Sequence, residues 1–399
     1  MTTATQVQLR RGTSTQVAAF TGAQAEIAVD TTNNRVVVQD GSTAGGFAAA
    51  KLAEAVTTIK ATDGAVVSQS AGSGGVTALV GGPGGHVNRF RNATMDVWQR
   101  GTSGTVTTSG GYTADGWIVV PTGASVPWAQ SSGRLLTKNA LQVTGASSVT
   151  DVIIKQRIES LIAAVFCSQT VTVQARVFNG TGGSITPTLT VKRPTAADNY
   201  ASTATDVSAV ALQACPNSVW TLVSYTFAAN ASSFNGLEIS FDFGNNFASG
   251  AKSVQLAELD IRVTPGATAG AQNANPPPPE LRPVGIELAL SQRYLIILNE
   301  GANGSVFAQV IGVCLTSTSA NLIVGYPPQR ANTTVTVSLG SLKILNGASG
   351  LALTGLTGST GTATAAVLGG TVASGLTAGF GTYLLGGGGS GQVVISSEL

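Results

Sequence analysis

Short runs of alternating apolar and polar residues follow one another along most of the chain. The clearest cover residues 171–178, 220–227, 237–243 and 255–263. Alternation with a period of two sends one set of side chains into a core and the other to a surface, which is typical of β-strands. Gly, Pro and Asn separate the runs, as turns require. The pattern predicts an all-β protein with a two-sheet β-sandwich, a jelly-roll, over residues 87–265.

Three more runs of this kind lie near the N-terminus, at residues 7–13, 26–30 and 35–41. The segment 31–34 between the second and third holds two Asn residues, which tolerate the left-handed backbone of a tight turn. A unit this small has one apolar face and no helix to cover it, so it cannot bury a core alone. We therefore expect it to borrow a surface, most simply from identical copies of the chain.

The spacing of apolar residues changes over residues 47–59. Leu52, Val56 and Ile59 recur at intervals of four and three, the rhythm of a coiled-coil seam. We expect a short helix with these three residues on a trimer seam, and a helix packed on its own domain is an equal alternative. The Gly- and Ser-rich stretch that follows predicts a linker, so residues 51–86 are interpreted as a short helix and a Gly-rich linker.

The last third of the chain opens with four consecutive prolines, Pro276 to Pro279. Such a run favours polyproline II and cannot join a β-ladder, so residues 266–283 are predicted to be a Pro-rich linker. Residues 284–399 return to short strands, and no charged residue lies between Lys343 and Glu398. We expect a distal β-rich, Gly-rich tip domain packed around a three-fold axis, because charges at such an interface would be desolvated without partners.

The composition narrows the classes of function. Charged residues make up 10% of the 399 residues, against about 25% in ordinary soluble domains, which predicts that much surface is buried between subunits. A net charge of +2 without a basic run indicates no nucleic-acid partner. No apolar run is long enough to predict membrane insertion, and no secretory signal is evident. Cys167, Cys215 and Cys314 are far apart, which favours buried thiols folded in a reducing cytoplasm.

Candidate catalytic groups are few. The single His, His86, excludes a Ser-His-Asp triad and a multi-His metal site. Glu238 and Asp242 would lie about 13 Å apart on one strand face, too far for glycoside hydrolysis, whereas Glu258 and Asp260 would lie about 6.6 Å apart. Arg262 would continue the strand face that carries Glu258 and Asp260. We therefore favour a solvated Glu-Asp-Arg row on the outer surface of a sheet. We therefore predict no enzyme, no catalytic residue, no metal site and no cofactor.

Aromatic side chains are better candidates for binding, because the C–H face of a sugar stacks on a ring. We interpret Trp98, Trp117 and Trp220 as core residues. Trp128 follows Pro127 and precedes polar residues, and Tyr200 and Tyr326 fall in loop sequences. Loops on a rigid scaffold often carry binding residues, so Trp128, Tyr200 and Tyr326 are predicted to contact a glycan or receptor.

The N-terminal runs V-Q-L-R-R-G-T, E-I-A-V-D and R-V-V-V-Q-D-G resemble the N-terminal domain of bacteriophage major tropism determinant proteins and related tail fibres. The resemblance implies that residues 1–50 form a trimeric β-prism that anchors the chain to the virion. The segments W-Q-R-G at 98–101 and Y-T-A-D-G-W at 112–117 resemble the carbohydrate-binding-module-like jelly-roll of many phage fibres. That resemblance leaves open a structural Ca²⁺ held with help from Asp260.

Residues 284–294 resemble the segment E-L-A-x-x-Q-R-Y that opens the distal domain of many phage fibres, with Ser291 where Cys is frequent. Together these resemblances imply a homotrimeric fibre or spike, assembled in the host bacterial cytoplasm and located in the virion. Its expected partners are tail or capsid proteins and a host glycan or outer-membrane component. A head fibre or decoration protein without a receptor site, and a glycan depolymerase tailspike, are the alternatives. The host, the receptor and the attachment point stay open.

Overall fold

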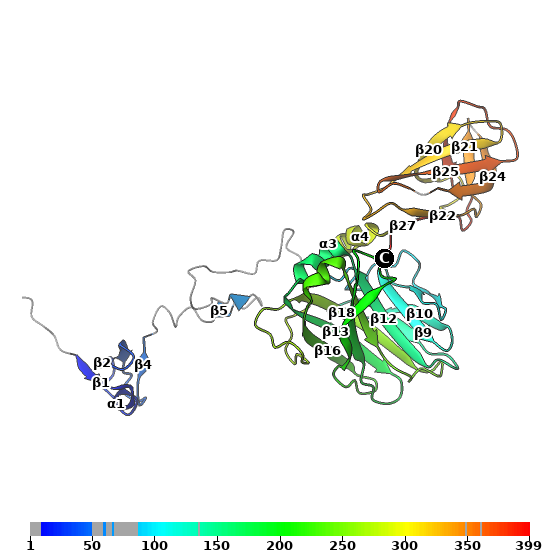
Figure 1. The fold of residues 1–399 in the computed structure, drawn as a ribbon. Helices are drawn as coiled ribbons and strands as arrows, with labels where there is room; N and C mark the ends of the chain where they lie inside the picture. The colour runs from blue at the N-terminus through cyan, green and yellow to red at the C-terminus, as the bar shows by residue number, and fades with distance from the viewer. Residues whose placement is uncertain are drawn as a thin grey trace, which may run out of the picture. The chain divides into compact units, whose positions relative to one another are not determined.

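The computed structural model describes residues 9–49, 59–60, 66–67, 87–134, 136–347, 349–359 and 361–399 (Figure 1). The described chain is mainly β-strand with a few short helices, which confirms the all-β prediction. It divides into two units, Met1–Gly85 and His86–Leu399, and each is described by itself. Within the described residues, no helix is long and apolar enough to cross a membrane.

The first unit contains a four-stranded sheet in the order β1-β2-β3-β4. Its strands are β1 (Arg10–Gly12), β2 (Ile27–Asp30), β3 (Arg35–Val38) and β4 (Phe47–Ala48). Helix α1 (Ser14–Ala18) lies between β1 and β2, and a capping box joins Thr13 and Gln16 at its start. Asn34 has a φ of 49° in the predicted turn. The three predicted strands are confirmed, and α1 is an addition.

The predicted helix over residues 47–59 is not seen at its described ends. Phe47 pairs with Val38 in the sheet, and Ile59 begins strand β5 (Ile59–Lys60), which pairs with β6 (Val66–Val67). At both ends of this segment the backbone therefore pairs with a neighbouring strand and does not form the helix that the spacing of apolar residues predicts. Leu52 and Val56 lie outside the described residues, so their seam stays a prediction.

The second unit contains the predicted β-sandwich. One sheet, called the first sheet below, has the order β16-β13-β18-β11-β10-β7, and the other has the order β15-β14-β17-β12-β9-β8. The strands are β7 (Ser103–Val106), β8 (Gly111–Tyr112), β9 (Trp117–Thr122), β10 (Val126–Ser132), β11 (Asn139–Thr144), β12 (Asp151–Ile158), β13 (Thr170–Gly180), β14 (Thr188–Pro194), β15 (Thr203–Ala211), β16 (Trp220–Ala228), β17 (Leu237–Asp242) and β18 (Ser253–Val263). The short helices α3 (Ser160–Ala163), η1 (Ala164–Phe166) and η2 (Ala231–Asn235) connect some of them.

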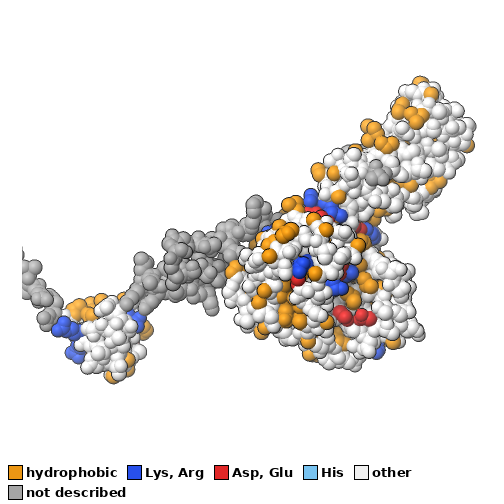
Figure 2. Space-filling model, viewed as in Figure 1, with side chains coloured by type: hydrophobic (Ala, Val, Ile, Leu, Met, Phe, Trp, Pro, Cys, Tyr) orange, Lys and Arg blue, Asp and Glu red, His pale blue; other side chains and the backbone are white. Residues whose placement is uncertain are grey.

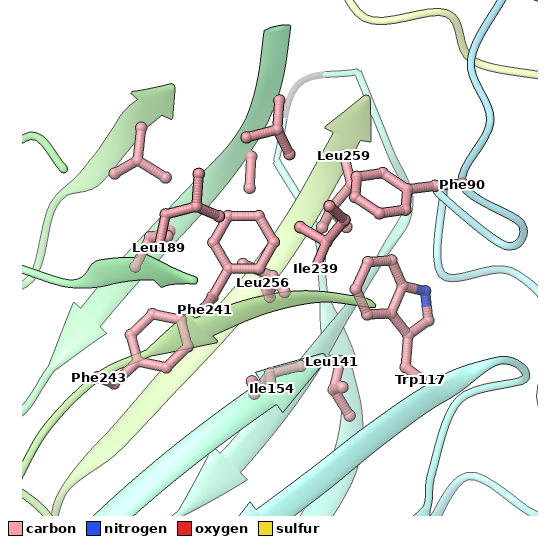
Figure 3. Packing of buried hydrophobic residues seen from close by; sticks show 14 of the residues in the cluster. Phe90, Trp117, Leu141, Ile154, Leu189, Ile239, Phe241, Phe243, Leu256 and Leu259 are labelled. Atoms are coloured by element: carbon pink, nitrogen blue, oxygen red, sulfur yellow. The ribbon is translucent and has the colours of Figure 1, made fainter. Parts of the chain in front are cut away.

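The core of the sandwich lies between these two sheets. On β13, residues Val171, Val173, Ala175 and Val177 are buried, as the alternation predicts. Aromatic rings, including Phe90, Trp117 and Phe241, pack among aliphatic side chains from both sheets (Figure 3). Burying each large side chain of this kind contributes roughly 1.5–3 kcal/mol relative to its exposure, so the sandwich stabilises itself.

The C-terminal part of the second unit is also β-structure. Helix α4 (Val284–Gln292) precedes a three-stranded sheet of β19 (Leu295–Asn299), β27 (Gln392–Ser396) and β22 (Thr334–Ser338). A closed barrel follows in the order β20-β21-β25-β24-β23-β26. Its strands are β20 (Val306–Cys314), β21 (Ser319–Gly325), β23 (Lys343–Asn346), β24 (Ser349–Gly358), β25 (Ala365–Val372) and β26 (Gly381–Leu385). The uncharged stretch after Lys343 therefore supplies most of β23, all of β24, β25 and β26 in the barrel, and β27 in the three-stranded sheet.

The Pro-rich segment lies against the sandwich. Ala271 forms an isolated antiparallel bridge with Thr226 of β16. Farther along, Gln174 Nε2 donates to the Pro277 carbonyl at 2.6 Å, and an Arg262 guanidinium nitrogen donates to the Pro278 carbonyl at 2.9 Å. We call residues 271–280 the strap. It covers part of the outer face of the first sheet.

Candidate functional site

One face of the N-terminal sheet is apolar and open. Ile27 pairs with Val38, which pairs in turn with Phe47, and Val36 follows on the same face of β3. These four residues, called the N-terminal apolar face, are 41%, 44%, 64% and 40% exposed, respectively. On the other face, Ala28 and Val37 are buried together with Val17 of α1. The sheet is thus apolar on both sides, although its own helix accompanies only one of them.

Hydrogen bonds to Asp30 hold the turn that presents this face. Ser14 Oγ donates to an Asp30 carboxylate oxygen at 2.9 Å, and Asn33 Nδ2 donates to the other at 2.9 Å. Burial alone would raise the pKa of Asp30, but these bonds and backbone donors from Thr32 and Asn33 outweigh it and lower the pKa to about 2. The turn between β2 and β3 is therefore fixed at neutral pH, and so is the register of the apolar face.

Trp128 is buried, whereas its polar sequence neighbours predict an exposed edge or loop. Its residue exposure is 6% and its ring stacks on Trp98 with centroids 5.9 Å apart. Strand β10 pairs with a neighbour on each side, which places Trp128 opposite Gly104 and Val143. Side chains alternate along β10, so Trp128 points into the core on the same side as the buried Val126, whereas Pro127 faces outward.

The hydroxyls of the two predicted contact tyrosines bind the chain's own backbone. The Tyr200 hydroxyl donates to the Ile158 carbonyl at 2.6 Å, and the Tyr326 hydroxyl donates to the Thr362 carbonyl at 3.0 Å. Burial raises the pKa of Tyr200. Both residues are half-buried, and the structure does not bring them together with Trp128 in one site. Their contact with a receptor stays a prediction.

The other tryptophans divide between core and surface. Trp117 is fully buried, as predicted, and Trp98 is partly buried against the core. Trp220 is only half-buried. Val223, Tyr225 and Phe227 of β16 point into the core. Trp220 belongs to the alternate set of side chains on this strand and therefore points outward. The interpretation of Trp220 as a core residue is therefore wrong.

Three of the four candidate carboxylates, Glu238, Glu258 and Asp260, are engaged in ion pairs. Glu238 contacts Arg157 at 2.8 Å and Lys155 at 3.1 Å. Burial opposes ionisation of Glu238, but these two cations prevail and its pKa is lowered. Glu258 and Asp260 are 1% and 0% exposed, which contradicts the solvated row predicted for them.

A β-bulge explains the error at Glu258. Its φ is 51°, and the pairing shifts so that Arg176 faces Ala257 while Gln174 faces Asp260. Asp260 forms an ion pair with Arg262 and accepts a hydrogen bond from the Glu280 amide at 2.7 Å. Its side chain is therefore occupied by protein groups. Within the described residues, no group of three or more His, Cys, Asp or Glu side chains could hold a metal ion.

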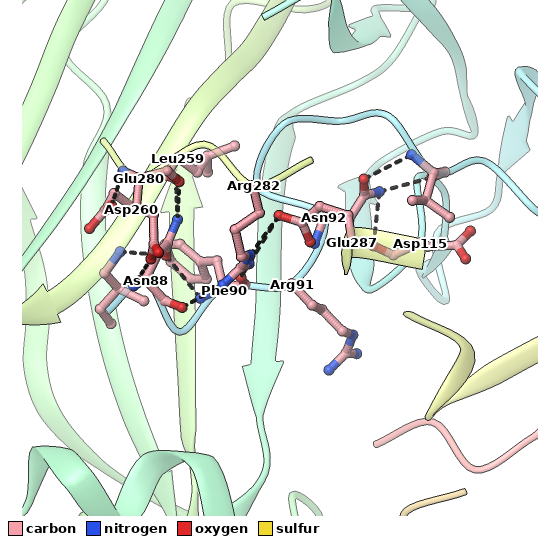
Figure 4. A network of polar contacts seen from close by, with 12 residues as sticks. Asn88, Phe90, Arg91, Asn92, Asp115, Leu259, Asp260, Glu280, Arg282 and Glu287 are labelled. Atoms are coloured by element: carbon pink, nitrogen blue, oxygen red, sulfur yellow. Dashed lines mark hydrogen bonds and ion pairs between the residues drawn. The ribbon is translucent and has the colours of Figure 1, made fainter. Parts of the chain in front are cut away.

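Residues 88–92 and the E-L-A-x-x-Q-R-Y motif, which begins in α4, meet where the C-terminal segments pack on the sandwich. Buried Arg282 contacts Glu287 of α4 at 3.0 Å and donates to the Asn88 carbonyl at 2.7 Å, while the Asn92 amide donates to Glu287 at 2.6 Å (Figure 4). Residues 88–92 are thereby joined to α4. Arg293 likewise contacts Glu159 at 2.9 Å.

The W-Q-R-G motif makes a second set of contacts to the C-terminal part. Gln99 Nε2 donates to the Leu295 carbonyl at 2.9 Å, and Arg100 forms an ion pair with Glu398. The Tyr112 hydroxyl donates to the Leu399 carbonyl at 2.7 Å. The motifs therefore serve packing within the second unit. Sequence reasoning missed this because the partners are almost 200 residues or more apart.

The surface of the barrel differs from that of this contact region. The barrel face in view in Figure 2 carries hydrophobic side chains but no charged ones. Ile311, Ile323 and Val367 are directly opposite one another on β20, β21 and β25 and are 64%, 52% and 43% exposed. This wall offers apolar contact without charge.

Comparison with known proteins finds matches for the N-terminal residues. Residues 7–43 match the family model of the major tropism determinant N-terminal domain. Over 47 residues the chain is 62% identical to the tail fiber receptor-binding protein of Bordetella phage BPP-1. That match spans 12% of each protein. The predicted resemblance of the N-terminal segment is confirmed, and it covers a small part of either chain.

The solved structures that the chain resembles are distant in sequence and in fold. The CBM22-2 xylan-binding domain of Paenibacillus barcinonensis is 11% identical, with a TM-score of 0.28 over 40% of this chain and 99% of that domain. The enzymatically active domain of tailspike protein 4 from bacteriophage CBA120 is 9% identical, with a TM-score of 0.28 over 45% of this chain and 22% of that one. Likenesses this weak carry no weight for function.

Proposed function

We propose that this chain is a homotrimeric bacteriophage fibre or spike protein that attaches the virion to the surface of the host cell. The N-terminal domain docks on tail or capsid proteins, and the second unit carries the contact with a host glycan or outer-membrane component. The observation that carries the proposal is the N-terminal apolar face, of which Ile27, Val36 and Val38 lie within the residues that match the tropism-determinant domain.

The physical basis is the cost of leaving this face in water. Ile27, Val36, Val38 and Phe47 form one continuous apolar surface on a domain too small for a second core. Covering apolar surface stabilises by roughly 25 cal/mol per Å², and three copies that cover one another satisfy all three faces at once. The low charge content and the apolar wall of the barrel support the same assembly.

Trimerisation also serves adsorption. Once one subunit has bound a cell surface, the second contact becomes intramolecular, so that affinity rises by about 10²–10⁴ without new contacts. A weak glycan site is then sufficient for firm attachment.

The test uses the purified full-length protein and the phage that carries it. Saturating protein should block adsorption of the phage to host cells, heat-denatured protein should not, and native mass spectrometry should show a trimer. Unimpeded adsorption in the presence of folded protein would overturn the proposal. Gold-labelled antibody on intact virions separates tail from capsid attachment.

A further inference from the structure

The outer face of the first sheet is divided into a covered half and an open half. Thr172, Gln174, Ser224 and Thr226 point outward on β13 and β16, yet they are at most 2% exposed, because the strap lies over them. The strap is held by their side chains: Gln174 donates to Pro277, and Ser224 Oγ donates to the Asn273 carbonyl. This sheet face therefore already binds one extended chain through side-chain donors.

The open half continues the same strands beyond the strap. Its residues lie in one register across five strands: Trp220 pairs with Phe178, Phe178 with Gln255, Gln255 with Gln142, and Gln142 with Ala129. All five are half-exposed. We call Trp220, Phe178, Gln255 and Gln142 the aromatic–amide row. With strands about 4.8 Å apart, the row from Trp220 to Gln142 spans about 14 Å.

The aromatic end of the row is a rigid apolar platform. The Phe178 and Trp220 rings have centroids 5.6 Å apart and planes tilted by 53°. The strands that carry them are anchored from below by the buried Val177 and Val223. Two rings with solvent on one side can stack against the C–H face of a sugar without rearrangement.

The amide end offers hydrogen-bonding groups at fixed positions. Gln255 Nε2 donates to Gln142 Oε1 at 3.3 Å, and Gln142 Nε2 donates to Thr144 Oγ1 at 3.2 Å. Within the described residues, Gln255 Oε1 has no hydrogen-bond partner, and each amide keeps a second N–H for a ligand. Donors and acceptors that alternate in this way match sugar hydroxyls, which both donate and accept.

Charge and backbone pairing narrow the kind of ligand. The row itself is neutral. Arg176 beside it lies 3.5 Å from Glu258, and burial and a second cation, Arg134, lower the pKa of Arg176. None of the four row residues carries a charge that would pair with an anionic ligand, so the row itself favours a neutral one. A peptide that adds a strand needs free backbone groups. The edge strand β16 has them, but β13, β18 and β11 are each paired on both sides, so such a peptide would not lie across the row.

We propose that the aromatic–amide row is a binding site for a neutral oligosaccharide, which lies across the strands beside the strap. The inference deepens the proposed function, on which it rests, because it names the site and the chemical class of the surface receptor. Trp220 and Phe178 stack on the sugar, and Gln255 and Gln142 orient its hydroxyls.

The test measures binding of the full-length protein to an array of neutral and acidic oligosaccharides. Wild type should bind neutral members, and Trp220→Ala should lose about tenfold or more in affinity, since removal of a central aromatic contact commonly has this effect. Trp220→Phe should retain most of the binding. Phe234→Ala is the matched control, because Phe234 is an exposed aromatic residue of the same sandwich.

Two outcomes would overturn the assignment: binding confined to acidic oligosaccharides or absent, or equal affinities for wild type and Trp220→Ala. Phage adsorption distinguishes this failure from failure of the proposed function. If wild type and Trp220→Ala block adsorption equally, the protein is an adhesin and the row is not its site. If wild type does not block adsorption, the proposed function fails even where the row binds sugar.

Discussion

The guanidinium carbon of Arg91 lies 3.8 Å from the centre of the Tyr294 ring. Arg91 belongs to the first segment of the sandwich, and Tyr294 ends the E-L-A-x-x-Q-R-Y motif. This cation–π contact joins residues about 200 positions apart, beside the ion pairs of Arg282 and Arg293. Partly desolvated contacts of this kind contribute about 0.5–2 kcal/mol. The sandwich and the C-terminal segments therefore fold as mutually dependent parts.

Removal of Arg100 should destabilise the second unit. Glu398 is its ion-pair partner, and the Glu398 side chain is only 7% exposed. Burial raises the pKa of Glu398, and Arg100 opposes that rise. Arg100→Ala leaves a buried carboxylate without this cation and should lower the free energy of unfolding by about 3 kcal/mol. Urea denaturation at pH 7.5 measures the loss.

A surface lysine supplies the matched control for Arg100. Lys138→Ala removes an exposed cation from the same sandwich and should change stability by less than about 0.5 kcal/mol. Glu398→Gln should restore part of the stability lost in Arg100→Ala, because the double variant buries no charge. Equal unfolding curves for Arg100→Ala and Lys138→Ala would contradict the role of this ion pair.

The Asp151–Asp242 pair should make stability depend on pH. Burial, together with the neighbouring Asp242 carboxylate, raises the pKa of Asp151 from 3.8 to about 6. Because the folded pKa is the higher one, the contribution to stability is full below pH 3.8 and is lost as pH rises through about 6. Asp151→Asn, which keeps an acceptor for the Val152 amide, should thus raise the melting temperature at pH 7.5.

The same variant should nearly match wild type at pH 3.5, since Asp151 is then mostly protonated in both states. Asp242→Asn should give a smaller gain at pH 7.5, because it ends the repulsion but leaves Asp151 partly buried. Thermal unfolding monitored by circular dichroism between pH 3.5 and 8 checks both. A gain that is constant over this range would refute the carboxylate pair as its cause.

Glycine in the barrel permits close approach of the strands. A Cβ added to Gly312 of β20 would lie 1.9 Å from the Asn321 carbonyl oxygen of β21, whereas a Cβ on Gly325 of β21 would meet nothing within 4 Å. Gly312→Ala should therefore cost about 2 kcal/mol or more. Gly325→Ala, the matched control, should be neutral or slightly stabilising. Equal denaturation midpoints for the two variants would disprove the close contact.

A charge on the N-terminal apolar face should break the trimer. Val38 sits between Ile27 and Phe47, so that Val38→Asp would bury three carboxylates in an assembled trimer. The variant should elute as a monomer in size-exclusion chromatography with light scattering. Gln24→Asp adds the same charge at an exposed position of the domain and should remain trimeric. A trimeric Val38→Asp would place the interface elsewhere.

The alternating pattern was sufficient to predict the sandwich but not every side-chain direction within it. Trp128 and Trp220 were assigned from their sequence neighbours, and the structure buries the first and leaves the second half-buried. The phase of alternation would have given the right answer, because Trp128 is in phase with buried Val126 and Trp220 is in phase with the outward Leu222. The phase thus locates the aromatic–amide row, which the sequence interpretation missed.

Other features had no local signal. The bulge at Glu258 inserts one extra residue into β18 and so interrupts the alternation of side chains between the two faces of the strand. The distance expected for two residues of a regular strand therefore does not apply to Glu258 and Asp260. The contacts of Gln99, Arg100 and Glu287 depend on residues almost 200 positions away or more. No periodicity encodes such pairs, although the W-Q-R-G and E-L-A motifs did mark the residues that form them.

The strap occupies part of a vulnerable edge of the sandwich, at β16, before it crosses the face of the sheet. The strap begins as a partner of β16, through the single bridge between Ala271 and Thr226, and Pro276 to Pro279 then supply carbonyl acceptors but no N–H donors. A chain without donors can lie against a sheet but cannot extend its ladder. The bridge at Thr226 closes part of the β16 edge, and the prolines over β13 and β18 offer no new ladder. Newly made subunits therefore have less free edge at which to join into insoluble aggregates.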